Sequence, residues 1–179
     1  MKYFTIQEMI SSATAQREGI DNRPPTSAYH LLHVLVDQLL DPIRKAWGSP
    51  IVISSGYRCK ELNALVGGAK NSHHLLGCAA DIIGGLPLNS QARLLNEAEA
   101  SAGATDAPLA SARRGGTSES TENEPESHKV KTNKTLFDFI VKMQQEGRIK
   151  FTQLILEGDG RWIHISYVPS DLRCQVIGE

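Results

Sequence analysis

The amino-acid sequence predicts an α+β fold, in which a small and mainly antiparallel sheet carries helices packed on one side. Four short apolar runs have the length and composition of strands. They are residues 50–55, 79–83, 151–157 and 161–167. In two further segments, 32–43 and 134–147, apolar residues recur at three- and four-residue steps, which is typical of helices with one buried face.

The N-terminal part of the chain is predicted to be helical. Thr5 followed three residues later by Glu8 is a capping-box pattern, and it opens a short helical lead-in over residues 3–19. In the longer helix that follows, Pro42 predicts either a kink or the start of a new short segment, because proline has no backbone N–H to donate. Gly48 then marks the end of that helix.

The last two predicted strands form a hairpin around the turn Glu157–Gly160, since an Asp-Gly pair beside a β-run is a strong turn signal. Side chains alternate between the two faces of a strand. On the returning strand, one face carries Trp162, His164 and Ser166. The apolar pair at residues 176–177 predicts a final short strand.

A length of 179 residues suits one domain, here residues 1–179, interrupted by a low-complexity insertion at about residues 86–133. From about Ala100 to Asn133, small and polar residues dominate and large apolar residues are almost absent. Such a composition buries too little apolar surface to offset the entropy of ordering the chain, so we expect disorder there. We assign no chemistry to this insertion.

Composition excludes several classes of partner. The formal net charge of −1 gives no electrostatic reason to expect nucleic-acid binding. The sequence contains no apolar run long enough to span a membrane, and the first residues lack the pattern of a signal peptide, so we expect synthesis in the cytoplasm. Three widely spaced cysteines, Cys59, Cys78 and Cys174, argue against a disulfide framework.

The stretch Ser72–Asp81 concentrates the chemistry of the chain. His74 and Asp81 offer an imidazole nitrogen and a carboxylate oxygen, which are both ligands that zinc accepts. Gly77 lets the backbone turn sharply between them. We interpret the stretch as half of a zinc site that needs a third ligand from elsewhere in the chain.

His164 on the predicted hairpin is the candidate for that third ligand. Two histidines and one carboxylate leave the fourth position of zinc open, which is the arrangement of a catalytic site rather than a structural one. Bound zinc lowers the pKa of water to about 7 and so provides a nucleophile at neutral pH. Glu157, at the other end of the hairpin, is our candidate for the general base. Arg58 follows a strand and a glycine turn, and its guanidinium suits a substrate carboxylate or a developing oxyanion.

Two alternatives for the metal ligands remain open at this point. His73 stands beside His74 and would compete for the metal if the loop slipped by one residue; otherwise we expect it to contact substrate or to support a ligand. A structural zinc held by Cys59, a histidine and Cys78 is conceivable, although the spacing matches no common pattern.

This constellation resembles the zinc D-alanyl-D-alanine carboxypeptidases and the related peptidoglycan endopeptidases, whose metal-site fold is shared with lysostaphin-type peptidases and the hedgehog signalling domain. The family's first motif is Ser-x-His-x-x-Gly-x-Ala-x-Asp. It is met in full by Ser72, His74, Gly77, Ala79 and Asp81. The run 54–58 is similar to the family's substrate-binding arginine segment, and the run 162–164 resembles its C-terminal motif. The resemblance covers about residues 3–85 and 134–168.

The resemblance implies one zinc ion per chain, held in a cleft on the sheet by His74, Asp81 and His164. It implies Arg58 as a substrate-binding and catalytic group. We add Ser72, His73 and Trp162 as candidate substrate-binding residues, with Ser72 also expected to cap its loop.

The sequence departs from the family at the last motif, where Arg161 and Trp162 stand at positions that hold a glutamate or a histidine in many relatives. The motif therefore does not fix the base, and we prefer Glu157 over Asp159 because its placement is similar to that of the glutamate in other relatives.

By resemblance, the expected function is hydrolysis of peptide bonds in bacterial cell-wall peptidoglycan, by a carboxypeptidase or a stem-peptide endopeptidase, with the chain as a monomer. Residues near the N-terminus, such as Thr5, Glu8 and Asp21-Asn22, are similar to those of a phage and prophage subgroup, which suggests a lysis enzyme (an endolysin) acting in the periplasm or cell wall. The alternatives are a zinc-containing module that binds peptidoglycan peptides without cleaving them, and an inactive remnant.

Overall fold

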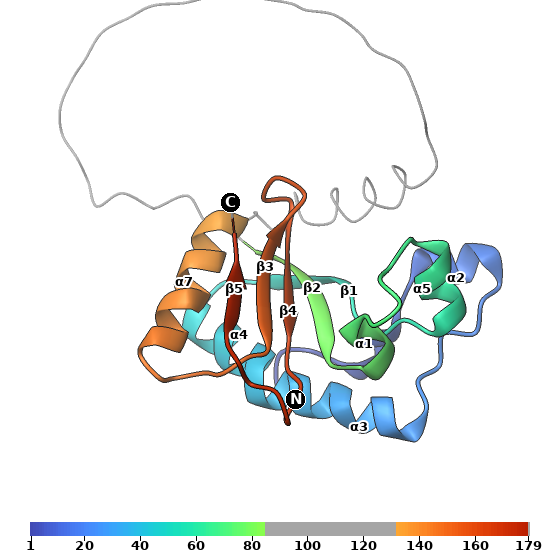
Figure 1. Ribbon diagram of the computed structural model, residues 1–179, viewed down its shortest axis with the longest axis horizontal. Coiled ribbons are helices and arrows are strands. Elements are labelled where there is room, and N and C mark those ends of the chain that lie inside the picture. Colours follow the sequence, from blue (N-terminus) through green and yellow to red (C-terminus); the bar gives the residue numbers. More distant parts are fainter. Residues whose placement is uncertain (85–131, 179) are drawn as a thin grey trace, which may run out of the picture.

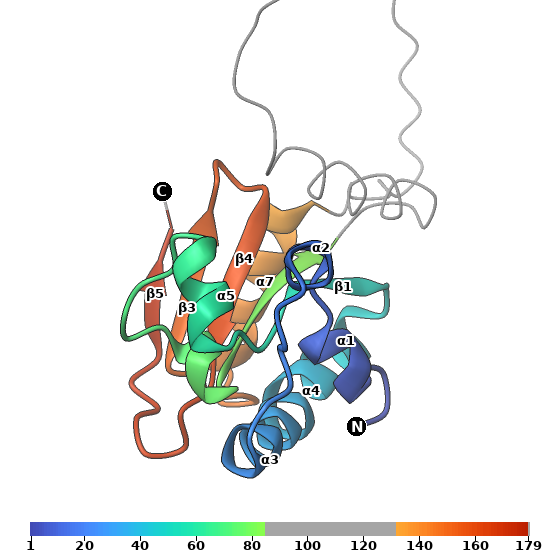
Figure 2. The same cartoon turned by 90° about the vertical axis from the view of Figure 1, so that its right-hand side faces the viewer.

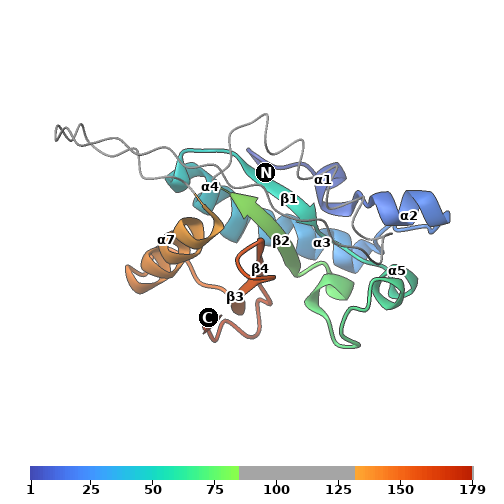
Figure 3. The same ribbon diagram turned by 90° about the horizontal axis from the view of Figure 1, so that it is seen from above.

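A five-stranded sheet forms the centre of the protein and helices flank it, as Figures 1, 2 and 3 show from three directions. The computed structural model describes residues 1–84 and 132–178. The helices are α1 (Ile6–Ile10), α2 (Ala13–Glu18), α3 (Thr26–Leu35), η1 (Val36–Leu40), α4 (Asp41–Trp47), α5 (Lys60–Leu65), η2 (His73–Leu76) and α7 (Asn133–Gln145). The strands are β1 (Ile51–Ser55), β2 (Ala79–Gly84), β3 (Gln153–Glu157), β4 (Trp162–Ser166) and β5 (Gln175–Ile177). The predicted α+β class is confirmed.

The strand order is β1-β2-β4-β3-β5, and each neighbouring pair is antiparallel except β3 and β5. The sheet is therefore mainly antiparallel, as predicted, and it has one parallel pair at its edge. Cys174 and Gln175 donate backbone hydrogen bonds to Phe151 and Thr152, which places the start of β5 beside the start of β3. Because the chain turns back at the end of β4, where β3 begins, β5 has to run in the same direction as β3.

The first segment is two short helices rather than a continuous lead-in. Thr5 caps α1 through the predicted capping box, in which its hydroxyl accepts from the N–H of Glu8 while the Glu8 carboxylate accepts from the N–H of Thr5. Ser11 adopts an extended conformation that ends α1, and Ser12 caps α2. The two helices therefore meet at a pair of serines, which favour caps over helix interiors.

The helix predicted around Pro42 is continuous but changes its hydrogen-bond pattern. Helix α3 passes into the π-turn η1 and then into α4, and the N–H of Asp41 bonds the carbonyl of Val36, five residues back. A proline in a regular helix collides with the carbonyl four residues before it, and a wider turn just ahead of the ring relieves that collision. Gly48 ends α4 in the left-handed conformation, with φ of 70°, as predicted.

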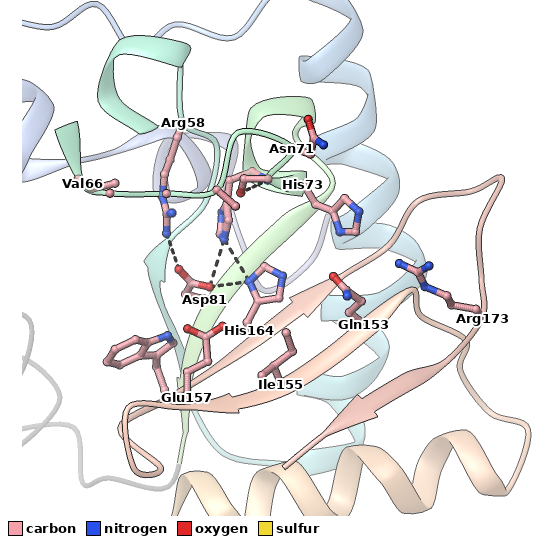
Figure 4. Close-up of a pocket in the computed structure, with 16 residues that line it drawn as sticks. Arg58, Val66, Asn71, His73, Asp81, Gln153, Ile155, Glu157, His164 and Arg173 are labelled. Carbon is pink, nitrogen blue, oxygen red and sulfur yellow. Dashed lines mark hydrogen bonds and ion pairs between the residues drawn. The ribbon is translucent and has the colours of Figure 1, made fainter. Parts of the chain in front are cut away.

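The sheet has one apolar face and one polar face. Alternate side chains of β2, β4 and β3 enter the main core with the apolar residues of α3, η1, α4 and α7. They are Ala80, Ile82, Leu154, Ile163 and Ile165. The residues between them point to the opposite face, where the segment between β1 and β2 borders a cleft (Figure 4).

Helix α7 begins at Asn133, one residue before the predicted start, and Thr132 caps it. The Asn133 side chain accepts from the N–H of Gly84 at the end of β2 and donates to the carbonyls of Gly160 and Arg161 in the β3–β4 turn. The rest of the predicted insertion, through residue 131, lies outside the described residues. Among the helices that are described, none has both the length and the apolar character needed to cross a membrane.

Candidate metal centre

The turn η2 presents His74 to the cleft. Ser72 caps the turn, since its hydroxyl accepts from the N–H of His74 at 3.3 Å. Gly77 ends it with φ of 73°, and a Cβ added there would lie 2.5 Å from the carbonyl oxygen of Ala28. Only glycine accepts both this conformation and this close approach to α3. The sharp turn predicted at Gly77 is therefore present, and it places His74 and Asp81 together.

His74 is buried, and one of its ring nitrogens is committed to the backbone. Its Nδ1 lies 2.6 Å from the carbonyl oxygen of Gly56. Because a carbonyl oxygen can only accept, Nδ1 carries the proton of the neutral ring, and the lone pair of Nε2 faces the cleft. Gly56 lies directly against the backbone of Met9, where any Cβ would meet the Met9 carbonyl oxygen at 2.1 Å. The N-terminal helix therefore fixes the group that orients His74.

Asp81 and His164 come from neighbouring strands in register. They are directly paired residues of β2 and β4, so their side chains leave the sheet on the same face. Asp81 Oδ1 lies 2.9 Å from His164 Nδ1 and 3.2 Å from His74 Nε2. The two histidine nitrogens are 3.2 Å apart. Figure 4 labels Asp81 and His164, whose side chains point toward one another in the cleft.

This triangle of atoms fits a metal ion. In a tetrahedral zinc site with bonds of about 2.0–2.1 Å, the ligand atoms stand about 3.3 Å from one another. The three measured separations, 2.9, 3.2 and 3.2 Å, are close to that value. Because Nδ1 donates to Gly56, His74 Nε2 can donate to Asp81 Oδ1 only when the ring carries a second proton, and a bound cation would take the place of that proton. Within the described part of the chain, this is the group of potential ligands whose donor atoms all come together.

The second oxygen of Asp81 is held by Arg58. Arg58 Nη2 lies 2.6 Å from Asp81 Oδ2, and Arg58 Nε donates to Ser55 Oγ at 2.9 Å. Burial alone would raise the pKa of Asp81, but hydrogen bonds from His164 and His74 hold that pKa below its usual range. The carboxylate is therefore ionised across the physiological pH range, which a metal ligand requires.

The ligands lie in a cleft of about 720 Å³ that also receives Glu157 and Trp162. These two residues are directly paired at the end of the β3–β4 hairpin. Asp159, the alternative base, occupies the turn in the left-handed conformation and does not line the cleft. Glu157 thus shares the cleft with the candidate metal ligands, whereas Asp159 does not line it.

His73 and the cysteines lie away from the ligand triangle. His73 Nδ1 contacts Ser166 Oγ at 3.0 Å on the wall of the cleft, where burial and then the charges of His164 and Arg173 lower its pKa. Cys59 caps α5 by accepting from the N–H of Leu62. Burial raises the pKa of the Cys78 thiol to about 11, which disfavours the thiolate that a metal would need.

Sequence reasoning missed two features of this cleft. It assigned Arg58 to substrate and did not predict its ion pair with Asp81. It also passed over Gln153 and Arg173, which line the cleft together with the predicted residues. Strand alternation could have found Gln153, since it shares a face with Glu157. No pattern in the sequence marks Arg173, because its position depends on how β5 returns to the sheet.

Two histidines and a carboxylate that converge in an open cleft are typical of metal-dependent hydrolases. A family model described as Peptidase M15 matches residues 2–111. The match covers more than half of the chain, and the protein therefore belongs to the M15 family of metal-dependent peptidases. It includes Arg58, His74 and Asp81, whereas His164 and Glu157 lie beyond its end. A comparison with curated proteins finds no match.

Proposed function

We propose that the protein is a zinc-dependent peptidase that hydrolyses peptide bonds in bacterial cell-wall peptidoglycan. The observation that carries the proposal is the ligand triangle of His74, Asp81 and His164, set in an open cleft of an M15 chain. Its zinc would bind one per chain, polarise the scissile carbonyl and supply an acidified water. A carboxypeptidase and an endopeptidase on the stem peptide would both use these ligands.

Glu157 is the general base in this proposal. Its carboxylate lines the cleft, and no described residue forms an ion pair with it. On β3 it stands two residues beyond Ile155, which is paired with His164, so it lies about 7 Å along the strand from the His164 position. A flexible carboxylate at that distance can take a proton from the attacking water and pass it to the leaving amine.

Arg58, in the same proposal, has two tasks. Through Nη2 it holds Asp81 in the orientation that turns Oδ1 toward the two histidines. Arg58 also lines the cleft, so an N–H group that is not used by Asp81 or Ser55 can donate to a substrate oxygen. Ser72, His73 and Trp162 line the same cleft and contribute to substrate binding.

The test is digestion of purified peptidoglycan by the zinc-loaded full chain, with mass analysis of the released fragments. We expect new peptide termini with the unsubstituted chain, and none with Glu157→Gln, which should still bind zinc. Asp159→Asn is the matched control, because asparagine accepts the left-handed backbone at residue 159 and should leave turnover intact. The fragment masses also identify which bond is cleaved, and so distinguish a carboxypeptidase from an endopeptidase.

Three results would count against the proposal. Full turnover by Glu157→Gln would refute the assigned base. A folded protein that takes up no zinc with its ligands intact would refute the metal site. Tight binding of intact muropeptides with no cleavage would instead favour the binding module, and the same zinc-loaded sample can report it.

A further inference from the structure

The cleft continues past the metal ligands to a second, positively charged end. Arg173 lies in the segment between β4 and β5 and lines the cleft with His73 and Gln153. Figure 4 shows its guanidinium directed toward Gln153, on the side of His164 opposite Arg58 and Glu157. The metal ligands thus lie between two ends of different character, with a carboxylate at one end and an arginine at the other.

Arg173 lines the cleft but forms no ion pair with the other described residues that line it. Four residues of the cleft carry formal charges, and two of them, Arg58 and Asp81, neutralise each other at 2.6 Å. Among the described residues, Arg173 forms an exposed ion pair with Asp171, from Nε to Oδ2 at 3.6 Å, which is too long for a hydrogen bond. The Arg173 side chain is 53% exposed. Its guanidinium N–H groups are therefore available to a ligand.

The spacing along β3 relates this end to the scissile bond. Gln153 stands two residues before Ile155, the residue paired with His164, and Glu157 stands two residues after it. Two residues of a strand span about 7 Å, which is also the length of about two residues of an extended peptide. A substrate group that reaches Arg173 therefore belongs to a residue next to the cleaved bond or one further on.

The neighbours of Arg173 supply polar groups and fix the wall. Gln153 Nε2 donates one hydrogen to Gln175 Oε1 at 2.9 Å and retains a second N–H. Ser166 Oγ contacts His73 Nδ1 at 3.0 Å and so holds that ring against β4. An arginine fork beside a spare amide N–H is suited to a carboxylate, which accepts two parallel hydrogen bonds.

We propose that Arg173, supported by Gln153, is a specificity-determining subsite for a substrate carboxylate within one or two residues of the cleaved bond. The proposal rests on the peptidase function proposed above. Two sources of that carboxylate fit the chemistry: the C-terminus of the peptide, as in a carboxypeptidase substrate, and an acidic residue beside the cleaved bond, as in an endopeptidase substrate.

The test measures the binding of two pairs of peptides to the zinc-loaded full chain carrying Glu157→Gln, so that the peptides stay intact. One pair is N-acetyl-D-alanyl-D-alanine with a free or an amidated C-terminus. The other pair is an N-acetylated, C-amidated tripeptide with a central glutamate or glutamine. Dissociation constants are determined by calorimetry with and without Arg173→Gln. Arg148→Gln is the matched control, because it removes the same charge from an exposed arginine that does not line the cleft.

We expect Arg173→Gln to raise the dissociation constant of the acid form in one peptide pair about tenfold and to leave that of its amide form unchanged. Arg148→Gln should leave both dissociation constants unchanged. The pair that loses its preference identifies the source of the carboxylate. Equal loss for acid and amide, no loss for either pair, or no binding of any peptide when Arg173 is present would overturn the subsite.

Fragment release from peptidoglycan by the unsubstituted chain is a separate measurement. A carboxylate preference without fragment release would therefore refute the peptidase function alone, and fragment release without the preference would refute the subsite alone.

Discussion

The two faces of strands β2, β4 and β3 have different roles. On β4, Ile163 and Ile165 are completely buried against the helices, whereas His164 between them faces the cleft. The neighbouring strand β2 repeats the pattern, with Ile82 in the core and Asp81 beside the histidines. Period-two alternation therefore builds a stability face and a chemistry face from adjacent residues. Substitutions one residue apart should separate stability from metal binding.

The largest expected effect belongs to the chemistry face. Replacing His164 with alanine removes one of the three proposed ligands. We expect zinc content to fall far below one per chain and peptidase activity to fall by about a thousandfold, about 4 kcal/mol of activation free energy. The free energy of unfolding of the metal-free protein should change little, because the ring is on the cleft side. Metal analysis and unfolding in urea measure the two quantities; retention of stoichiometric zinc would contradict the assigned ligand.

The next effect belongs to the stability face. Ile163→Ala deletes buried methylene and methyl groups beside His164, and it should lower the free energy of unfolding of the metal-free protein by about 3 kcal/mol. Zinc stoichiometry should stay at one per folded chain. Ile155→Ala is the control, since Ile155 lies on the cleft face and is only half-buried, and it should cost less. Equal costs for the two variants would show that the faces are not distinct.

A smaller effect tests how Arg58 orients Asp81 on the chemistry face. If its ion pair with Asp81 orients the carboxylate, Arg58→Gln should weaken zinc affinity about tenfold to a hundredfold, as measured by competition with a chelator. Arg17→Gln, at an exposed arginine paired with Glu18, should leave the affinity unchanged. Unchanged zinc affinity with a raised KM in Arg58→Gln would instead assign this arginine to substrate alone.

The smallest effect concerns Cys78, a buried thiol next to the metal-site strand. Its pKa is raised to about 11, so the folded protein keeps a proton that the unfolded chain releases above about pH 9. Stability should therefore fall as the pH rises from 9 toward 11, by about 1 to 2 kcal/mol at pH 10.5 from this group. Cys78→Ala should lose that part of the alkaline decline, which urea unfolding at pH 8 and pH 10.5 can detect.

The fold class and the ligand candidates were predictable because both rest on local patterns. Alternation on β4, the capping box at Thr5 and the turn at Gly77 each involve residues within a few positions of one another. The expected strands and the helix starting near Lys134 agree with β1 to β4 and α7 to within a few residues.

The features that could not be predicted depend on contacts between distant segments. The pairing of Arg58 with Asp81 joins a loop to a strand 23 residues away, and no pattern in either segment encodes it. The parallel pairing of β5, which brings Arg173 to the cleft, depends on the path of the chain after β4. The π-turn before Pro42 is a third example, since the sequence predicts a disturbance there but not which hydrogen bond changes.

The register between β2 and β4 would give the proposed zinc ion a further role in how the chain reaches its fold. Asp81 and His164 are 83 residues apart, and they face the same side only when paired directly. A slip of one residue would turn one strand's ligand into the apolar core and destroy the binding site. Zinc should therefore select the native register during folding, and the appearance of bound metal would report the moment at which the two halves of the chain have joined correctly.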